Sequence, residues 1–174
     1  MAFGEKGNKM TSLRWPTEDA ERTNWKELFS VKLQWKKLTS TAKGPQKAHA
    51  EDAAWDLYAD CSENDIIIGP NQTVIVPTGL AIMPPEGWAC DIRGRSGMNS
   101  KGKFAVLGLV DSFYTGPWGV VVYNGGVESI KIMHHDKIAQ FTVQRVFSSQ
   151  LVEVESFDDK GSRGSGGFGS SGAK

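Results

Sequence analysis

GLVDSFYTG, at residues 108–116, separates two apolar runs, Phe104–Leu107 and Trp118–Tyr123. Two β-prone runs joined by a segment bounded by glycines predict a hairpin, with Asp111, Tyr114 and free backbone groups at one rim. An acid in that position can act as a general base toward water, and a neighbouring aromatic ring offers a flat face to a ring-shaped ligand. A turn in which the aspartate caps its own backbone is the alternative for an isolated Asp-Ser pair.

Further β-prone runs lie on both sides of this stretch, and no convincing long helix interrupts them. They are Trp55–Ala59, Ile66–Ile68, Thr73–Val76, Leu80–Met83, Trp88–Ile92, Ile130–Met133, Ile138–Phe147 and Leu151–Val154. Residues 31–38 fit a first strand imperfectly, and residues 96–101 are a candidate short helix. Closely spaced strands with turns such as GPN (69–71) and PPEG (84–87) predict an all-β fold, a small jelly roll or distorted barrel.

The two ends of the chain differ from this central part. Residues 1–29 predict an N-terminal extension, partly helical or disordered, and residues 157–174 a flexible, glycine-rich C-terminal arm. We therefore expect one β domain over residues 30–156.

Composition points the same way. A chain of 174 residues with 39% hydrophobic residues is long enough for one compact domain. Lys+Arg and Asp+Glu both number 20, so net charge gives no reason to propose a stable nucleic-acid or membrane partner. Residues 1–50 carry ten Lys/Arg against five Asp/Glu. We interpret this bias as a solvated extension, the alternative being contact with a polyanion.

Cys61 and Cys90 are too few for a disulfide framework and lack metal-ligand spacing, which predicts reduced thiols in an intracellular protein. No apolar run approaches the roughly 20 residues that span a bilayer, and the N-terminus has no signal-peptide core. We expect a soluble protein of the cytoplasm, or of the host cytoplasm if the chain is viral.

The RSG motif at residues 95–97 follows a predicted strand. Arg95 supplies a planar fork for phosphate oxygens, Ser96 a short donor and Gly97 room for close backbone approach. Taken alone, the motif is more often a plain turn.

RGSGGFGSSG, at residues 163–172, is a stronger phosphate signal, because a glycine run can wrap a polyphosphate with its N–H groups while Arg163 neutralises charge. Phe168 has little core to join there, so we expect it to stack on a ligand's ring. A disordered linker is the alternative. No Gly-Lys-Ser/Thr follows, so this is not a Walker P-loop.

Acids within the other strands leave two interpretations open. Asp56 lies inside an otherwise apolar run, where a hydrogen-bonded structural aspartate and an outer magnesium ligand are equally consistent with the pattern. Asp136 and Gln140 pose the same question at the start of another strand. The adjacent His134 and His135 would point to opposite faces of a strand, which argues against a two-histidine metal site.

Taken in order, Asp56, the RSG motif, Asp111 with Tyr114, Asp136 with Gln140, and the glycine-rich arm resemble the five motifs of the homotrimeric dUTPase family. The resemblance spans roughly residues 31–172. It implies a β jelly roll assembled as a homotrimer, with active sites between subunits and the arm of one subunit closing over a pocket made by the others.

The resemblance also implies individual roles. Asp111 would activate water for in-line attack on the α-phosphorus of dUTP, releasing dUMP and pyrophosphate, which keeps uracil out of DNA and supplies dUMP for thymidylate synthesis. Tyr114 would pack beneath the deoxyribose and exclude a 2′-hydroxyl, and Asp56 would reach Mg²⁺ through water. The remaining residues expected to bind substrate are Arg95, Ser96, Gly97, Gly108, Leu109, Val110, Gln140, Arg163, Ser165, Phe168 and Gly169.

The sequence departs from the family pattern at Ala54-Trp55, Met98, Phe113, His135 and Lys137, none of which is assigned to catalysis. A dCTP deaminase on the same fold is one alternative function. Another is a regulatory binding protein that uses the scaffold as a nucleotide-gated surface, with a protein partner docking on the N-terminal extension. The Asp111 segment and the arm favour the hydrolase.

Overall fold

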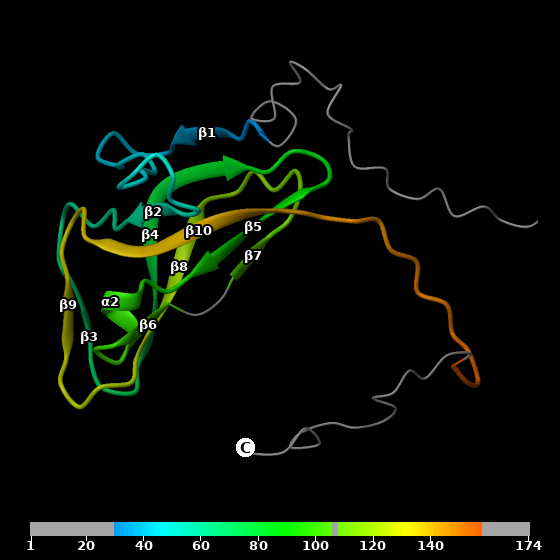
Figure 1. The fold of residues 1–174 in the computed structure, drawn as a ribbon. Coiled ribbons are helices and arrows are strands. Elements are labelled where there is room, and N and C mark those ends of the chain that lie inside the picture. Colours follow the sequence, from blue (N-terminus) through cyan, green and yellow to red (C-terminus); the bar gives the residue numbers. More distant parts are fainter. Residues whose placement is uncertain (1–29, 106–107, 158–174) are drawn as a thin grey trace, which may run out of the picture.

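The computed structural model describes residues 30–105 and 108–157, in which ten strands and one short helix form an all-β body (Figure 1). Every strand pairing in these residues is antiparallel. The predicted all-β class is therefore confirmed.

The first sheet has the order β1-β4-β8-β6. Its strands are β1 (Gln34–Lys37), β4 (Thr73–Met83), β8 (Trp118–Asn124) and β6 (Lys103–Ala105). β8 alternates strictly, with Trp118, Val120, Val122 and Asn124 buried and the residues between them half-exposed. This alternation places one face of the sheet toward the core.

The second sheet has the order β2-β10-β5-β7, and a small third sheet pairs β3 with β9. The strands are β2 (Trp55–Tyr58), β10 (Lys137–Arg145), β5 (Trp88–Arg93), β7 (Gly108–Val110), β3 (Ile66–Ile68) and β9 (Ile130–Ile132). No two neighbouring strands in either large sheet are consecutive in the sequence, so the chain crosses repeatedly between the sheets. The helix α2 (Ser96–Asn99) follows β5.

The core lies between the two large sheets. Trp118 of β8 meets Phe141 of β10 edge to face, with ring centroids 5.2 Å apart. Around them lie fully buried aliphatic side chains, among them Leu57, Val76, Leu80, Val120 and Ile138. Each such side chain contributes about 1.5–3 kcal/mol through removal of apolar surface from water.

β4 corrects the sequence prediction of two separate strands at 73–76 and 80–83. The register slips between Pro77, which pairs with Gly119, and Leu80, which pairs with Trp118, so one strand continues through a bulge. Gly79 takes a φ of 64°, and the Thr78 hydroxyl donates to the Trp118 carbonyl at 2.7 Å. A bulge absorbs residues that resemble a turn in sequence without ending the strand.

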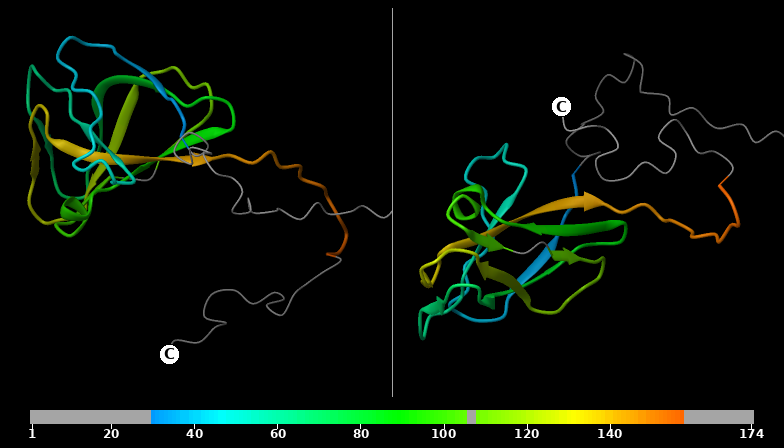
Figure 2. Two further views of the ribbon diagram at one scale, coloured as in Figure 1. Left: turned by 45° about the horizontal axis from the view of Figure 1, so that its top comes forward. Right: turned by 90° about the horizontal axis from the view of Figure 1, so that it is seen from below.

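The strand predicted at Leu151–Val154 was wrong. After β10 the chain leaves the body as an extended segment without strand pairing, seen in orange in Figure 2. Leu151 is 98% exposed and Val154 54% exposed. Apolar, β-prone composition does not make a strand when no neighbouring strand accepts its hydrogen bonds.

The predicted hairpin was right in one respect and wrong in another. β6 and β8 pair, with Lys103 opposite Asn124. Residues 108–110, however, form β7, which pairs with β5 in the other sheet. β6 and β7 thus belong to different sheets, and Asp111 follows the strand that pairs with β5. Among the described residues, no helix is long and apolar enough to cross a membrane.

Candidate active site

A cavity of about 310 Å³ opens where the two large sheets meet beside Asp111. It is lined by Ile92 of β5, by β7, by the loop that follows β7 and by the start of β8; the residues are Ile92, Gly108, Leu109, Val110, Asp111, Tyr114, Pro117, Trp118 and Gly119. The sequence prediction of a pocket at Asp111 and Tyr114 agrees with this cavity. Its size suits a nucleoside better than a large macromolecular segment.

The open edge of β7 borders this cavity. β7 is the last strand of its sheet, paired with β5 on one side, and no strand of the described residues pairs with its other side. Alternate residues of an antiparallel edge strand direct their N–H and C=O groups outward. A planar ligand can therefore hydrogen-bond to the backbone of Gly108–Val110.

Asp111 is the first residue after β7, and its side chain is exposed at the mouth of the cavity. Tyr114 follows, 45% exposed, and its hydroxyl donates to the Pro117 carbonyl at 3.3 Å. A Cβ atom on Gly116 would lie 2.4 Å from the Tyr114 hydroxyl oxygen, so only glycine leaves room for the ring in this position. The turn thereby fixes an acid and an aromatic face on one rim.

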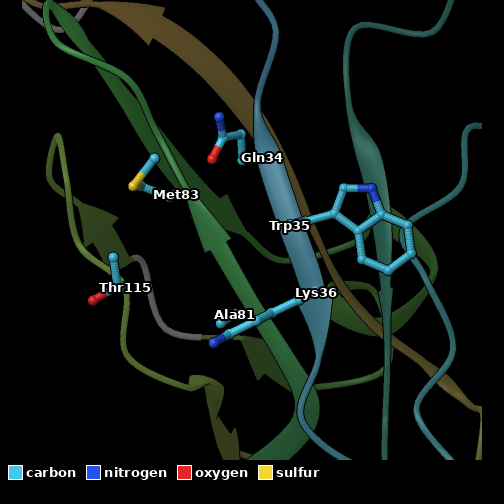
Figure 3. A pocket seen from close by; sticks show the side chains of 6 residues that line it. All are labelled: Gln34, Trp35, Lys36, Ala81, Met83 and Thr115. Carbon is cyan, nitrogen blue, oxygen red and sulfur yellow. The ribbon is translucent and has the colours of Figure 1, made fainter.

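A second groove, of about 360 Å³, has Thr115 of the same loop in its lining (Figure 3). It is lined by Gln34, Trp35 and Lys36 of β1, by Ala81 and Met83 of β4, and by Thr115. In Figure 3, Lys36 and Met83 lie on one side of β1 and the Trp35 ring on the other. This groove has no acid or histidine in its lining, so it offers no general base.

Asp56 is the centre of a separate cluster. Its side chain is only 10% exposed, and it forms ion pairs from Oδ1 to Arg95 Nε at 3.0 Å and from Oδ2 to Lys137 Nζ at 2.7 Å. The hydrogen bond to Asp56 raises the pKa of the Lys137 ammonium above its usual value. A carboxylate this deeply buried needs such partners. Asp56 therefore fixes Arg95 in place.

The other predicted phosphate-binding residues surround Arg95. Ser96 and Gly97 open α2 and are exposed, and the space in which a Gly97 side chain would stand is empty within 4 Å. Gln140 pairs in register with both Asp56 and Arg93, and its side-chain amide donates to the Gly94 carbonyl at 3.2 Å. The structure thus brings together three motifs that are far apart in sequence.

The surroundings of Asp56 limit how a metal ion could bind there. The described residues contain no group of three or more His, Cys, Asp or Glu side chains able to hold a metal ion. Both Asp56 oxygens already pair with cations, so direct coordination would displace one of them. A water-mediated contact is compatible, because each carboxylate oxygen keeps a further lone pair and Mg²⁺ commonly retains several waters. The residues fit an outer-sphere magnesium contact.

His134 and His135 contradict the prediction of opposite faces. They lie in the turn between β9 and β10, with ring centroids 3.7 Å apart. His135 has a φ of 66°, which breaks the alternation that a strand would impose. Asp136 caps the same turn, accepting from Met133 N at 2.8 Å. Asp136 thus has a structural role here.

Comparison with known proteins places these features in a family. The sequence model of the dUTPase family matches residues 40–172. The chain belongs to the dUTPase family. It is 37% identical to the deoxyuridine 5'-triphosphate nucleotidohydrolase of Alkaliphilus metalliredigens over 84% of this chain and 100% of that protein. It is 41% identical to the enzyme of the same name from Wolinella succinogenes, over 84% and 97%.

A solved structure shares the fold. The Staphylococcus bacteriophage 80alpha dUTPase with dUPNHPP superposes with a TM-score of 0.75 at 26% identity, over 82% of this chain and 99% of that one. The family resemblance carried by the motifs is therefore confirmed. Residues 1–39 lie outside the family match.

Within this family member, the described motifs form two groups that do not share a cavity. The cavity beside Arg95, of about 300 Å³, is also lined by Lys103, Lys131 and Lys137, and none of its lining residues belongs to the Asp111 cavity. Arg163, Ser165, Phe168 and Gly169 lie outside the described residues.

Sequence reasoning did not assign the Lys137 ion pair, since only the pairing of β2 with β10 brings this lysine to Asp56.

Proposed function

We propose that this chain hydrolyses dUTP to dUMP and pyrophosphate, with uracil in the cavity beside β7 and Asp111 as the general base. Curated relatives at 37% and 41% identity carry the name of this activity. The observation that carries the assignment is the juxtaposition of an open strand edge and an exposed carboxylate in one cavity.

The β7 edge explains a preference for uracil. Successive outward groups of a strand edge read donor, acceptor, donor, which complements the O4, N3–H and O2 groups of uracil. Cytosine presents an amino donor and an unprotonated N3 instead, so two contacts would mismatch. Buried unpaired polar groups carry large penalties, which makes this a strong discrimination.

Asp111 would accept a proton from water as the water oxygen attacks the α-phosphorus. A new P–O bond forms, the bond from the α-phosphorus to the bridging oxygen breaks, and pyrophosphate leaves with the electron pair. Tyr114 would lie against the deoxyribose, where a 2′-hydroxyl meets the ring. Arg95, Ser96, Gly97 and Gln140 would hold the phosphates.

Mg²⁺ is proposed as the cofactor, with Asp56 contacting it through water; when bound, the ion neutralises charge on the triphosphate and orients it. Asp56 also orders Arg95 for its phosphate contact. The arm would add Arg163, Ser165, Phe168 and Gly169 to the substrate.

A homotrimer is proposed as the functional assembly. The segment after β10 exposes several large apolar side chains, namely Val146, Phe147, Leu151, Val152, Val154 and Phe157. Apolar surface of this extent is typical of a surface that other subunits cover. Assembly would also bring the Asp111 cavity of one subunit to the Arg95 cluster of another.

The first test incubates the purified chain with Mg²⁺ and each of dUTP, dCTP, dTTP and UTP, and identifies the products by chromatography. We expect dUMP and pyrophosphate from dUTP alone. Conversion of dCTP to dUTP would instead support the deaminase. Asp111→Asn serves as the matched variant: it should bind dUTP and lose turnover, and unchanged turnover would remove Asp111 from the role of base.

A regulatory role through residues 1–29, and a cytoplasmic location, stay predictions. Phage dUTPases such as that of Staphylococcus bacteriophage 80alpha control transfer of virulence genes, so a second role exists for a protein of this fold. Deletion of residues 1–29, with activity and partner binding both measured, would separate a docking role from catalysis.

A further inference from the structure

The loop that carries Asp111 is attached to the Pro84–Trp88 turn by two hydrogen bonds. The Ser112 hydroxyl donates to the Trp88 carbonyl at 2.6 Å, and the Phe113 backbone N–H donates to the Pro84 carbonyl at 2.8 Å. We call Ser112, Phe113 and their two acceptors the loop clamp. The clamp begins at the residue next to Asp111.

The Ser112 side chain continues the β5–β7 pairing beyond the last residues that pair through their backbones. In the β5–β7 register, Ile92 pairs with Gly108 and Cys90 with Val110. Two residues further along, the same register places Ser112 opposite Trp88, and there a side-chain hydroxyl supplies the hydrogen bond in place of the backbone ladder. This bond holds the chain to β5 after it has stopped being a strand.

Phe113 has a backbone conformation that is unfavourable for its residue type, so the surrounding contacts must hold the loop in place. Its φ of 63° is unusual for a residue other than glycine, and the residue is 59% exposed, so core packing does not compensate for the strain. The hydrogen bond from the Phe113 N–H to the Pro84 carbonyl compensates for this strain. Pro84 and Pro85 have restricted φ angles, which makes their turn a stiff anchor. Strained backbone beside a proposed general base points to a functional constraint.

We propose that Ser112 is a positioning residue that fixes the direction of the Asp111 carboxylate through the loop clamp. The inference rests on the proposed function and deepens it. β7 restrains the backbone before Asp111, and the loop clamp restrains it immediately after. The Asp111 carboxylate therefore points toward the attacking water from a backbone that is held on both sides. Ser112 acts through Asp111 and needs no contact with substrate.

The decisive variants are Ser112→Ala, which removes the donor, and Ser112→Thr, which keeps it. Ser112→Ala should lower kcat for dUTP by about 10- to 100-fold, as expected for a misplaced catalytic group. KM and the dissociation constant of dUpNHpp should stay within about twofold, because Ser112 is not proposed to bind substrate. Ser112→Thr should restore most of kcat.

Two measurements separate positioning from general loss of stability. Ile68→Val, in the core at β3, removes one methylene from a fully buried side chain away from the Asp111 loop and is the control for a mild stability loss; it should keep wild-type kcat. Hydrogen–deuterium exchange should increase over residues 111–117 in Ser112→Ala and not in Ile68→Val, a readout that does not depend on activity.

Each outcome bears on the proposal. A wild-type kcat in Ser112→Ala, or a kcat in Ser112→Thr as low as that of Ser112→Ala, overturns positioning by the hydroxyl. The proposed function stays intact in that case, provided that the wild-type chain hydrolyses dUTP. An equal fall in activity in Ile68→Val assigns the effect to stability and also overturns the proposal. Absence of dUTP turnover in the wild-type chain overturns the proposed function and this inference together.

Discussion

At the scale of single residues, the candidate site depends on small residues that leave space for a neighbouring side chain. Gly116 is the clearest case, since any side chain there would overlap the Tyr114 hydroxyl. The obstacle is the far end of a side chain rather than backbone, so the ring can move aside at low cost. A substitution should therefore change the site more than the stability.

Gly116→Ala tests this. We expect the displaced Tyr114 ring to loosen the exclusion of the 2′-hydroxyl, so that the ratio of kcat/KM for dUTP to that for UTP falls about tenfold, with thermal stability almost unchanged. Thr115→Ala, in the same loop, is the control and should keep the ratio. A Gly116→Ala variant with wild-type discrimination would show that the position of the Tyr114 ring does not set sugar selectivity.

At the scale of elements, a buried carboxylate attaches the loop after β1 to the strands beneath it. Asp60 accepts hydrogen bonds from the hydroxyls of Thr39 and Thr41, and its side chain is 5% exposed. His134 Nδ1 lies 3.7 Å from Asp60 Oδ1, and His135 Nε2 lies 2.8 Å from the Thr41 carbonyl oxygen. The loop, β2 and the β9–β10 turn therefore share one polar cluster.

This cluster predicts a pH dependence. Burial by itself would raise the pKa of Asp60, but the two threonine hydroxyls and the neighbouring histidines outweigh it, so the pKa is lowered from its ordinary value of 3.8. A lowered folded-state pKa adds stability above the unfolded-state value, and this stability is lost as the pH falls through the folded-state value.

Asp60→Asn should thus lower the free energy of unfolding by about 1–3 kcal/mol at pH 7, the usual range for hydrogen bonds to a charged group. The difference from wild type should shrink as the pH falls below about 4. Urea unfolding at a series of pH values measures it. Asp52→Asn, at a more exposed aspartate, is the control. A difference that persists unchanged in acid would assign the effect to shape rather than to charge.

At the scale of the whole molecule, the proposed chemistry needs two clusters that one chain keeps apart. Asp111 lines one cavity and Arg95 another, with no shared residues. A trimer with sites between subunits would unite them.

Subunit complementation tests the arrangement. Asp111→Asn and Arg95→Gln should each be inactive alone, yet trimers co-expressed from both should regain about a quarter of wild-type activity, because random assembly leaves that share of sites intact. Size-exclusion chromatography with light scattering checks that both variants form trimers. Co-expressed protein no more active than either variant would place both residues within one subunit.

The sequence alone determined the class of fold and the family. The β-prone apolar runs and the glycine and proline turns between them are local patterns, so they can be recognised in the sequence itself, and five ordered motifs carried the resemblance. Only the tertiary structure decided which residues meet. Antiparallel pairing of β2 with β10 brings Lys137 to Asp56, and the β5–β7 register brings Ser112 to Trp88. It also decided that residues 151–154 are not a strand, because a strand depends on a neighbour that local sequence does not encode.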